Sequence, residues 1–214
     1  MSRENYLDIP IFRKVMIDPE IKGFFLNNYF MAFYAIALVS SLARYRTYFD
    51  TVLKYLPIVI GYTLLTEVLG LLIRDIEEIR IVYAEGYSYY NILIYNIFDI
   101  VFFIYFFYVY WRTITNKKFR RIIVWGGALF MLASLINPFL QDFVLYPQMM
   151  ASSIGSLVLI VCIILYFKES TSIDRLLVKR NLLFWISIGL LIFYTLYPFI
   201  QLIGYFDYNL YQQL

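Results

Sequence analysis

The chain has 214 residues, of which 62% are hydrophobic and 15% are charged, and its formal net charge at pH 7 is +3. A soluble domain carries about 25% charged and roughly 45–50% apolar residues, so this composition excludes an ordinary soluble fold and indicates an integral membrane protein. Because the chain contains no histidine, histidine-ligated zinc or haem, a Ser-His triad and a phosphorelay histidine are excluded within it.

The first 23 residues mix both charge signs and include Pro10 and Pro19. No apolar stretch there precedes a small-residue cleavage site, so the segment is not typical of a cleavable signal peptide. We expect residues 1–23 to form a tail or a short interfacial segment.

Six apolar runs follow in chain order, at 24–43, 53–73, 89–111, 121–140, 149–167 and 182–204. Each is close to the roughly 20 residues that a helix needs to cross a bilayer, and the short alternating strands of a membrane barrel are absent. We therefore predict an all-α membrane protein, a bundle of six transmembrane helices forming one domain over 24–204. Residues 205–214 would be a short extracytoplasmic tail.

Basic residues are concentrated in alternate loops. Twelve occupy the first, third and fifth loops and their edges: Arg44, Arg46, Lys54, Arg112, Lys117, Lys118, Arg120, Arg121, Lys168, Arg175, Lys179 and Arg180. The second loop has two and the fourth has none. Since cytoplasmic loops are enriched in Lys and Arg, this pattern places both termini outside a plasma (inner) membrane. An outward C-terminus also fits a relative of a seven-helix bundle.

The third run is apolar apart from Asn91, Asn96 and Asp99. On a helix, Asn91, Tyr95 and Asp99 follow one another at intervals of four residues on one face, and Asn96 lies within about 60° of Asp99. A charge facing lipid costs roughly 3 kcal/mol or more, so this face is expected to look into the bundle.

Other runs also carry polar stripes, and most of these residues fall in the outer half of the predicted bundle. Glu67 lies beside two threonines, and Gln148, Ser152 and Ser156 are spaced by four. We predict an outward-facing polar pocket closed below by aromatic and aliphatic side chains. Its candidate residues are Glu67, Asn91, Tyr95, Asn96, Asp99, Asn137, Gln141 and Gln201. Amides and hydroxyls also serve as ordinary interhelical hydrogen-bonding groups, whereas intramembrane carboxyls are functional candidates by default.

These features favour a non-enzymatic protein that binds a small solute and signals through a membrane or cytoplasmic protein partner. One alternative is a proton-coupled secondary transporter that uses Asp99 and Glu67. Two others are a non-catalytic assembly subunit and a lipid-processing enzyme with an Asp/Glu acid–base pair. No glycine loop for nucleotides is present, and we expect no metal, no cofactor and no nucleic-acid partner. The lipid bilayer is the expected environment.

Overall fold

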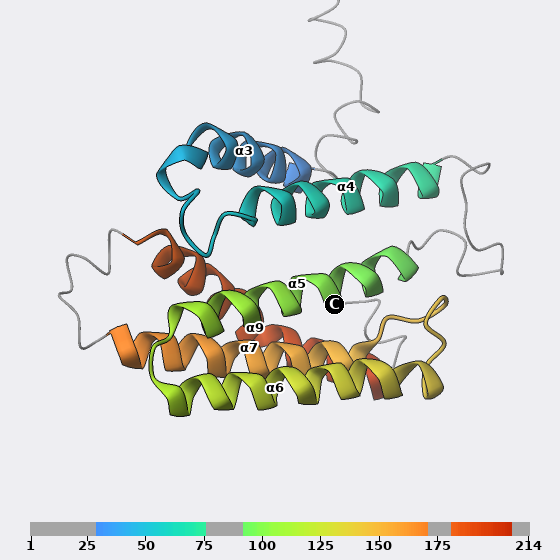
Figure 1. Cartoon of the computed structure of the whole chain (residues 1–214). Helices are drawn as coiled ribbons and strands as arrows, with labels where there is room; N and C mark the ends of the chain where they lie inside the picture. Colours follow the sequence, from blue (N-terminus) through green and yellow to red (C-terminus); the bar gives the residue numbers. More distant parts are fainter. Residues whose placement is uncertain (1–28, 76–91, 171–180, 207–214) are drawn as a thin grey trace, which may run out of the picture.

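A computed structural model of the chain describes residues 29–75, 92–170 and 181–206. Within these ranges all regular structure is helical, as Figure 1 shows. The long elements are α3 (Tyr29–Ala43), α4 (Leu56–Asp75), α5 (Ile92–Thr113), α6 (Lys117–Ile136), α7 (Met149–Ser170) and α9 (Leu182–Phe206). Two short 3-10 helices, η1 (Tyr45–Thr47) and η3 (Asn137–Phe139), lie in the connections.

Among the described residues, five helices are long and apolar enough to cross a membrane: α4, α5, α6 continued by η3, α7 and α9. The predicted class, an all-helical multi-pass membrane protein, is thereby confirmed. Helix α3 is apolar but has 15 residues, or about 22 Å at 1.5 Å per residue, against a hydrocarbon core of about 30 Å. The predicted first span, 24–43, starts outside the described residues, so a count of six spans stays a prediction.

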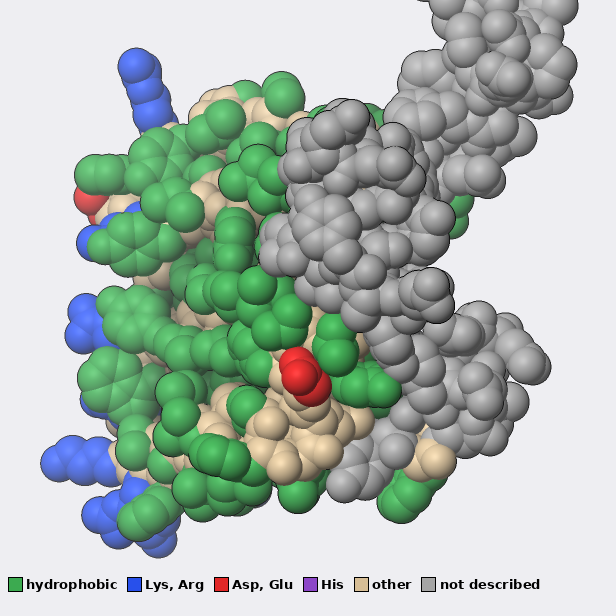
Figure 2. Space-filling view, turned by 90° about the vertical axis from the view of Figure 1, so that its right-hand side faces the viewer, with side chains coloured by type: hydrophobic (Ala, Val, Ile, Leu, Met, Phe, Trp, Pro, Cys, Tyr) green, Lys and Arg blue, Asp and Glu red, His purple; other side chains and the backbone are tan. Residues whose placement is uncertain are grey.

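Successive long helices run in opposite directions, so the described connections alternate between the two ends of the bundle (Figure 1). Residues 44–55 and 114–116 lie at one end, and residues 137–148 lie at the other. Figure 2 shows Lys and Arg side chains along one edge of the molecule, beside a broad band of hydrophobic side chains. The gathering of Lys and Arg at one edge agrees with their concentration in alternate loops of the sequence. The assignment of the basic loops to the cytoplasm stays a prediction.

Helix α7 is the central helix of the bundle. It packs against α5, α6 and α9, and 50% of its span is buried against 22–33% for the other four spans. Gly155 makes the contact with α5 and α6 close, because a Cβ there would lie 2.8 Å from the Phe103 ring and 2.9 Å from the Phe130 ring. Further along α7 from Gly155, the side chains of Leu159, Cys162 and Ile163 are fully buried.

The third long helix, α5, changes character along its length. Its first half carries the polar residues, whereas its second half contributes Phe103, Phe106, Phe107, Val109 and Tyr110 to the hydrophobic core. Tyr110 is completely buried, and its hydroxyl group pairs with that of Ser187 in α9 at 2.8 Å. The apolar half of the bundle is therefore well packed, and the polar chemistry lies toward the end that carries the 137–148 connection.

Local side-chain hydrogen bonds set where α6 begins. The Asn116 side chain accepts from the backbone N–H groups of Lys118 and Phe119, a standard N-cap. The carboxylate of Glu169, at the end of α7, accepts from the backbone N–H groups of Thr115 and Asn116 and from the Thr115 hydroxyl. These bonds tie the α5–α6 turn to α7 at the basic end of the bundle.

Candidate functional site

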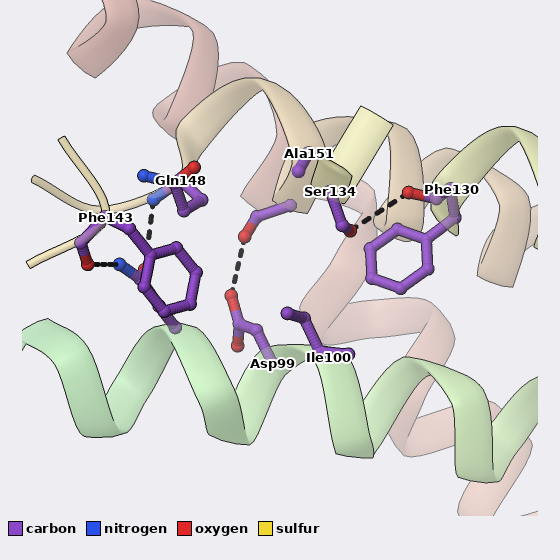
Figure 3. Close-up of a pocket in the computed structure, with 9 residues that line it drawn as sticks. Asp99, Ile100, Phe130, Ser134, Phe143, Gln148 and Ala151 are labelled. Carbon is purple, nitrogen blue, oxygen red and sulfur yellow. Dashed lines mark hydrogen bonds between the residues drawn. The ribbon is translucent and has the colours of Figure 1, made fainter. Parts of the chain in front are cut away.

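A small cavity lined by both polar and apolar side chains lies between α5, α6 and α7, next to the 137–148 connection (Figure 3). Its polar lining consists of Asn96, Asp99, Ser134, Gln148 and Ser152, and its apolar lining includes Phe130 and Phe143. The centre of a water molecule has about 10 Å³ in which to move, which is about what one buried water needs. The cavity therefore has room for a single water-sized species.

Asp99 is the carboxyl group of this cavity. It lies about 10 Å along α5 from the first residue, at 1.5 Å per residue, and Figure 3 shows its side chain pointing from α5 toward α7. Its Oδ2 accepts a 2.6 Å hydrogen bond from the Ser152 hydroxyl. Tyr194 of α9 is within electrostatic range. None of the Lys and Arg residues in the described ranges is close enough for an ion pair with Asp99, so its described partner is neutral.

Ser152 behaves differently from most serine and threonine side chains in the described helices. Ser134, Ser153, Ser156, Ser187, Thr63, Thr66, Thr113 and Thr195 each donate to the carbonyl four residues earlier. This is the usual way in which a helix satisfies a hydroxyl without help from a neighbouring helix. Ser152 instead donates across the interface to Asp99, so a side-chain hydrogen bond joins α7 to α5.

Asn96 holds the 137–148 connection against α5. Its amide nitrogen donates to the carbonyl oxygens of Phe143 and Tyr146 at 2.8 and 3.0 Å. Its amide oxygen accepts from the backbone N–H of Gln148 at 3.1 Å. Asn96 is 4% exposed, and three bonds satisfy most of what its side chain can form.

Asn137, the first residue of η3 directly after α6, plays a matching part. Its amide oxygen accepts from the backbone N–H of Ala151 at 2.9 Å, and its amide nitrogen donates to the side chain of Gln141 at 3.0 Å. Ala151 lies in the first turn of α7, where helix N–H groups have no partner within the helix. Asn137 and Asn96 thus hold the 137–148 connection and the first turn of α7 in place. These two segments close one side of the cavity.

Gln148 lines the same cavity and is 5% exposed. Its amide nitrogen donates to the carbonyl oxygens of Gln141 and Tyr146 at 3.2 and 3.4 Å. Its amide oxygen is buried and accepts no hydrogen bond within the described residues. A buried acceptor without a partner is costly, and such groups in native proteins call for an explanation.

Glu67 and Tyr95 form a separate polar contact. The Tyr95 hydroxyl donates to Oε2 of Glu67 at 2.8 Å, joining α4 to α5. Gly70 allows the approach, since a Cβ at that position would lie 3.0 Å from the Tyr95 hydroxyl. Neither Glu67 nor Tyr95 lines the cavity of Asp99.

The structure therefore divides the predicted site residues among several locations. Asn96 and Asp99 line one cavity. Asn137 and Gln141 bond to each other in the 137–148 connection beside it, and Glu67 and Tyr95 bond to each other between α4 and α5. The predictions for Asn91 and for the side chain of Gln201 lie outside what the structure describes.

Three further polar residues that line the cavity were not among the predicted site residues: Ser134, Gln148 and Ser152. The spacing of Gln148 and Ser152 on one helix face was the available signal for two of them. In the described part of the chain no group of three or more His, Cys, Asp or Glu side chains could hold a metal ion.

Apolar helices of membrane-spanning length and a small polar cavity between them define the chain as a polytopic membrane protein of the all-helical class. No protein-family model, curated protein or solved structure matches it.

Proposed function

We propose that the chain binds a small solute at the Asp99 cavity and that a membrane or cytoplasmic partner protein senses the occupied state. The observation that carries this proposal is a carboxyl group that lines a polar cavity while bonded only to a hydroxyl among the described residues. Buried charges in proteins are normally paired or bind ions. A carboxyl group inside the membrane without such a partner is a candidate binding group.

The position of the cavity suggests how binding would be communicated. Asp99 is less than one helical turn from Asn96, which holds the connection between α6 and α7. Ser152, the partner of Asp99, is in the first turn of α7. A ligand that binds Asp99 or Ser152 would therefore shift the start of α7 relative to α5. Because α7 packs against α5, α6 and α9, a shift of α7 would also move its contacts with these helices.

The contacts favour binding over catalysis. An acid–base pair or an aspartyl dyad needs two carboxyl groups that act on one reacting bond. Glu67 is bonded to Tyr95 between α4 and α5, whereas Asp99 is bonded to Ser152 between α5 and α7. We therefore propose a non-enzymatic role. On the asymmetry of Lys and Arg between the loops, we further propose that the protein lies in the plasma membrane with both termini outside.

A second candidate function is proton-coupled secondary transport. It is favoured by the presence of two membrane-embedded carboxyl groups, each bonded to a hydroxyl, since chains of acidic groups are typical of proton-driven transporters. A proton-linked uptake signal in proteoliposomes that disappears in Asp99→Asn would favour transport over sensing.

Native mass spectrometry of the protein, extracted gently from its own membrane, tests the proposal. We expect a discrete small mass on the wild type and on the control Glu67→Gln, and its loss in Asp99→Asn. An equal mass on Asp99→Asn would contradict a site at Asp99. A second polypeptide with no small molecule would replace the proposal with that of an assembly subunit.

A further inference from the structure

We propose that the ligand of the Asp99 cavity is a monovalent cation of about the size of Na⁺. Its oxygen ligands would be the carboxylate of Asp99, the amide oxygen of Gln148 and the hydroxyl oxygen of Ser152. This inference rests on the proposed function, because it names the solute class for the same site.

Gln148 supplies the independent reason to expect a cation. The two hydrogen bonds donated by its amide nitrogen fix the orientation of the amide group, so the oxygen cannot exchange places with the nitrogen without losing both bonds. That oxygen is buried, has no donor among the described residues and belongs to a residue that lines the cavity. It needs a positive partner, and a bound cation or a donated proton would provide one.

Ser152 can supply a second neutral oxygen ligand to a cation in the cavity. Its hydroxyl donates its proton to Asp99 beside the cavity, which leaves the two lone pairs of Oγ available as ligands. A hydroxyl that bonds back to its own helix directs its proton there, whereas Ser152 is held at the cavity by the carboxylate. The three oxygen-bearing groups come from α5, from α7 and from the residue just before α7, so a cation would join the elements that Asp99 and Asn96 already connect.

Size and charge select the kind of cation. A cavity of about 10 Å³ for the centre of a water molecule accommodates one water-sized species. One carboxylate balances one positive charge, which matters in a low-dielectric interior because a residual charge is strongly unfavourable. Ca²⁺ takes six to eight oxygen ligands, and Mg²⁺ keeps several waters. Neither requirement suits a cavity this small with one carboxylate.

The experiment compares thermal unfolding of the full-length protein in detergent in NaCl, NH₄Cl and choline chloride at constant ionic strength. Choline is far too large for the cavity, so it controls for general salt effects. We expect a saturable rise of the midpoint temperature in NaCl over choline chloride. At a hundredfold excess over the dissociation constant the rise is expected to be on the order of 5 °C. A rise in NH₄Cl but not in NaCl would support the cation site and identify ammonium as its occupant.

Variants locate the effect. Asp99→Asn, which keeps the shape and removes the charge, is expected to abolish the difference between NaCl and choline chloride, and Ser152→Ala to reduce it. Ser156→Ala is the matched control, because Ser156 is buried one turn further along α7 and its hydroxyl bonds only to the Ser152 carbonyl. If Asp99→Asn fails to fold, the comparison of Ser152→Ala with Ser156→Ala still tests the site.

Equal midpoints in all three salts for the wild type would overturn the inference and leave a water molecule as the occupant. A cation effect that persists in Asp99→Asn would overturn it too. The proposed function would survive either result if native mass spectrometry still showed a small uncharged solute lost in Asp99→Asn. If that solute were absent as well, both proposals would fail.

Discussion

Replacing Asn96 with leucine tests whether this side chain holds the connection at residues 137–148 in place. The substitution keeps the number and branching of the side-chain heavy atoms and removes three hydrogen bonds, to the carbonyls of Phe143 and Tyr146 and from the N–H of Gln148. Because leucine has no polar group of its own to bury, the loss comes from the three backbone groups left behind.

Two estimates bracket the magnitude. In soluble proteins, a buried backbone group that loses its partner costs roughly 1–3 kcal/mol, whereas side-chain hydrogen bonds inside membrane bundles average about 0.6 kcal/mol each. Phe143 and Tyr146 are only partly buried and Gln148 is buried, so water can replace the two lost bonds to the carbonyls better than the bond from the N–H. We therefore expect a loss of about 2 kcal/mol in the free energy of unfolding, or roughly 4–8 °C in the midpoint temperature.

The assay is equilibrium unfolding of the purified protein in mixed micelles of a mild and a denaturing detergent, followed by far-ultraviolet circular dichroism. Ile97→Leu serves as the control, since Ile97 is the next residue and is 43% exposed. Asn96→Asp is expected to be at least as damaging as Asn96→Leu, because a carboxylate oxygen would face the carbonyls of Phe143 and Tyr146. A loss below about 0.5 kcal/mol for Asn96→Leu, with the control unchanged, would refute the role assigned to Asn96.

Two other substitutions test the helix contacts. Gly155→Ala is expected to destabilise the protein by about 1–2 kcal/mol, because overpacking against two aromatic rings outweighs the helix propensity of alanine. Gly189→Ala, whose Cβ would have nothing within 4 Å, is expected to be neutral or slightly stabilising in the same unfolding assay. Tyr95→Phe should cost about 0.6 kcal/mol by removing the bond to Glu67. In a double-mutant cycle with Glu67→Gln, additive losses would show that the bond contributes nothing.

The helices themselves were largely predictable, because hydrophobic runs of membrane-spanning length leave little freedom. The run at 53–73 became α4 at Leu56–Asp75, and the run at 182–204 became α9 at Leu182–Phe206. The run predicted at 121–140 became α6 at Lys117–Ile136, where the Asn116 cap sets the start and the 3-10 helix that contains Pro138 follows the end. The first helix is the least tested of these predictions, because part of its range lies outside the described residues.

The partners of the polar residues could not be predicted from the sequence. Asn96 bonds to backbone groups 47, 50 and 52 residues away, and every residue offers the same carbonyl and amide groups to such a bond. The pairing of Ser152 with Asp99 depends on how α5 and α7 are rotated about their axes, which periodicity alone does not determine. The spacing of the polar residues identifies a face, but only the packing shows which of them share a cavity.

The central position of α7 also bears on how the protein is made. The main helix contacts join α3 with α4, α4 with α5, α5 with α6, and α7 with α5, α6 and α9. Each helix therefore packs against elements synthesised shortly before it. When α7 leaves the ribosome, α5 and α6 already provide the ring surfaces that receive Gly155, and α9 follows to cover the remaining side. Most helix contacts therefore join elements made one after another, whereas the pairing of Tyr110 in α5 with Ser187 in α9 requires α5 to keep a side chain ready for a helix made later.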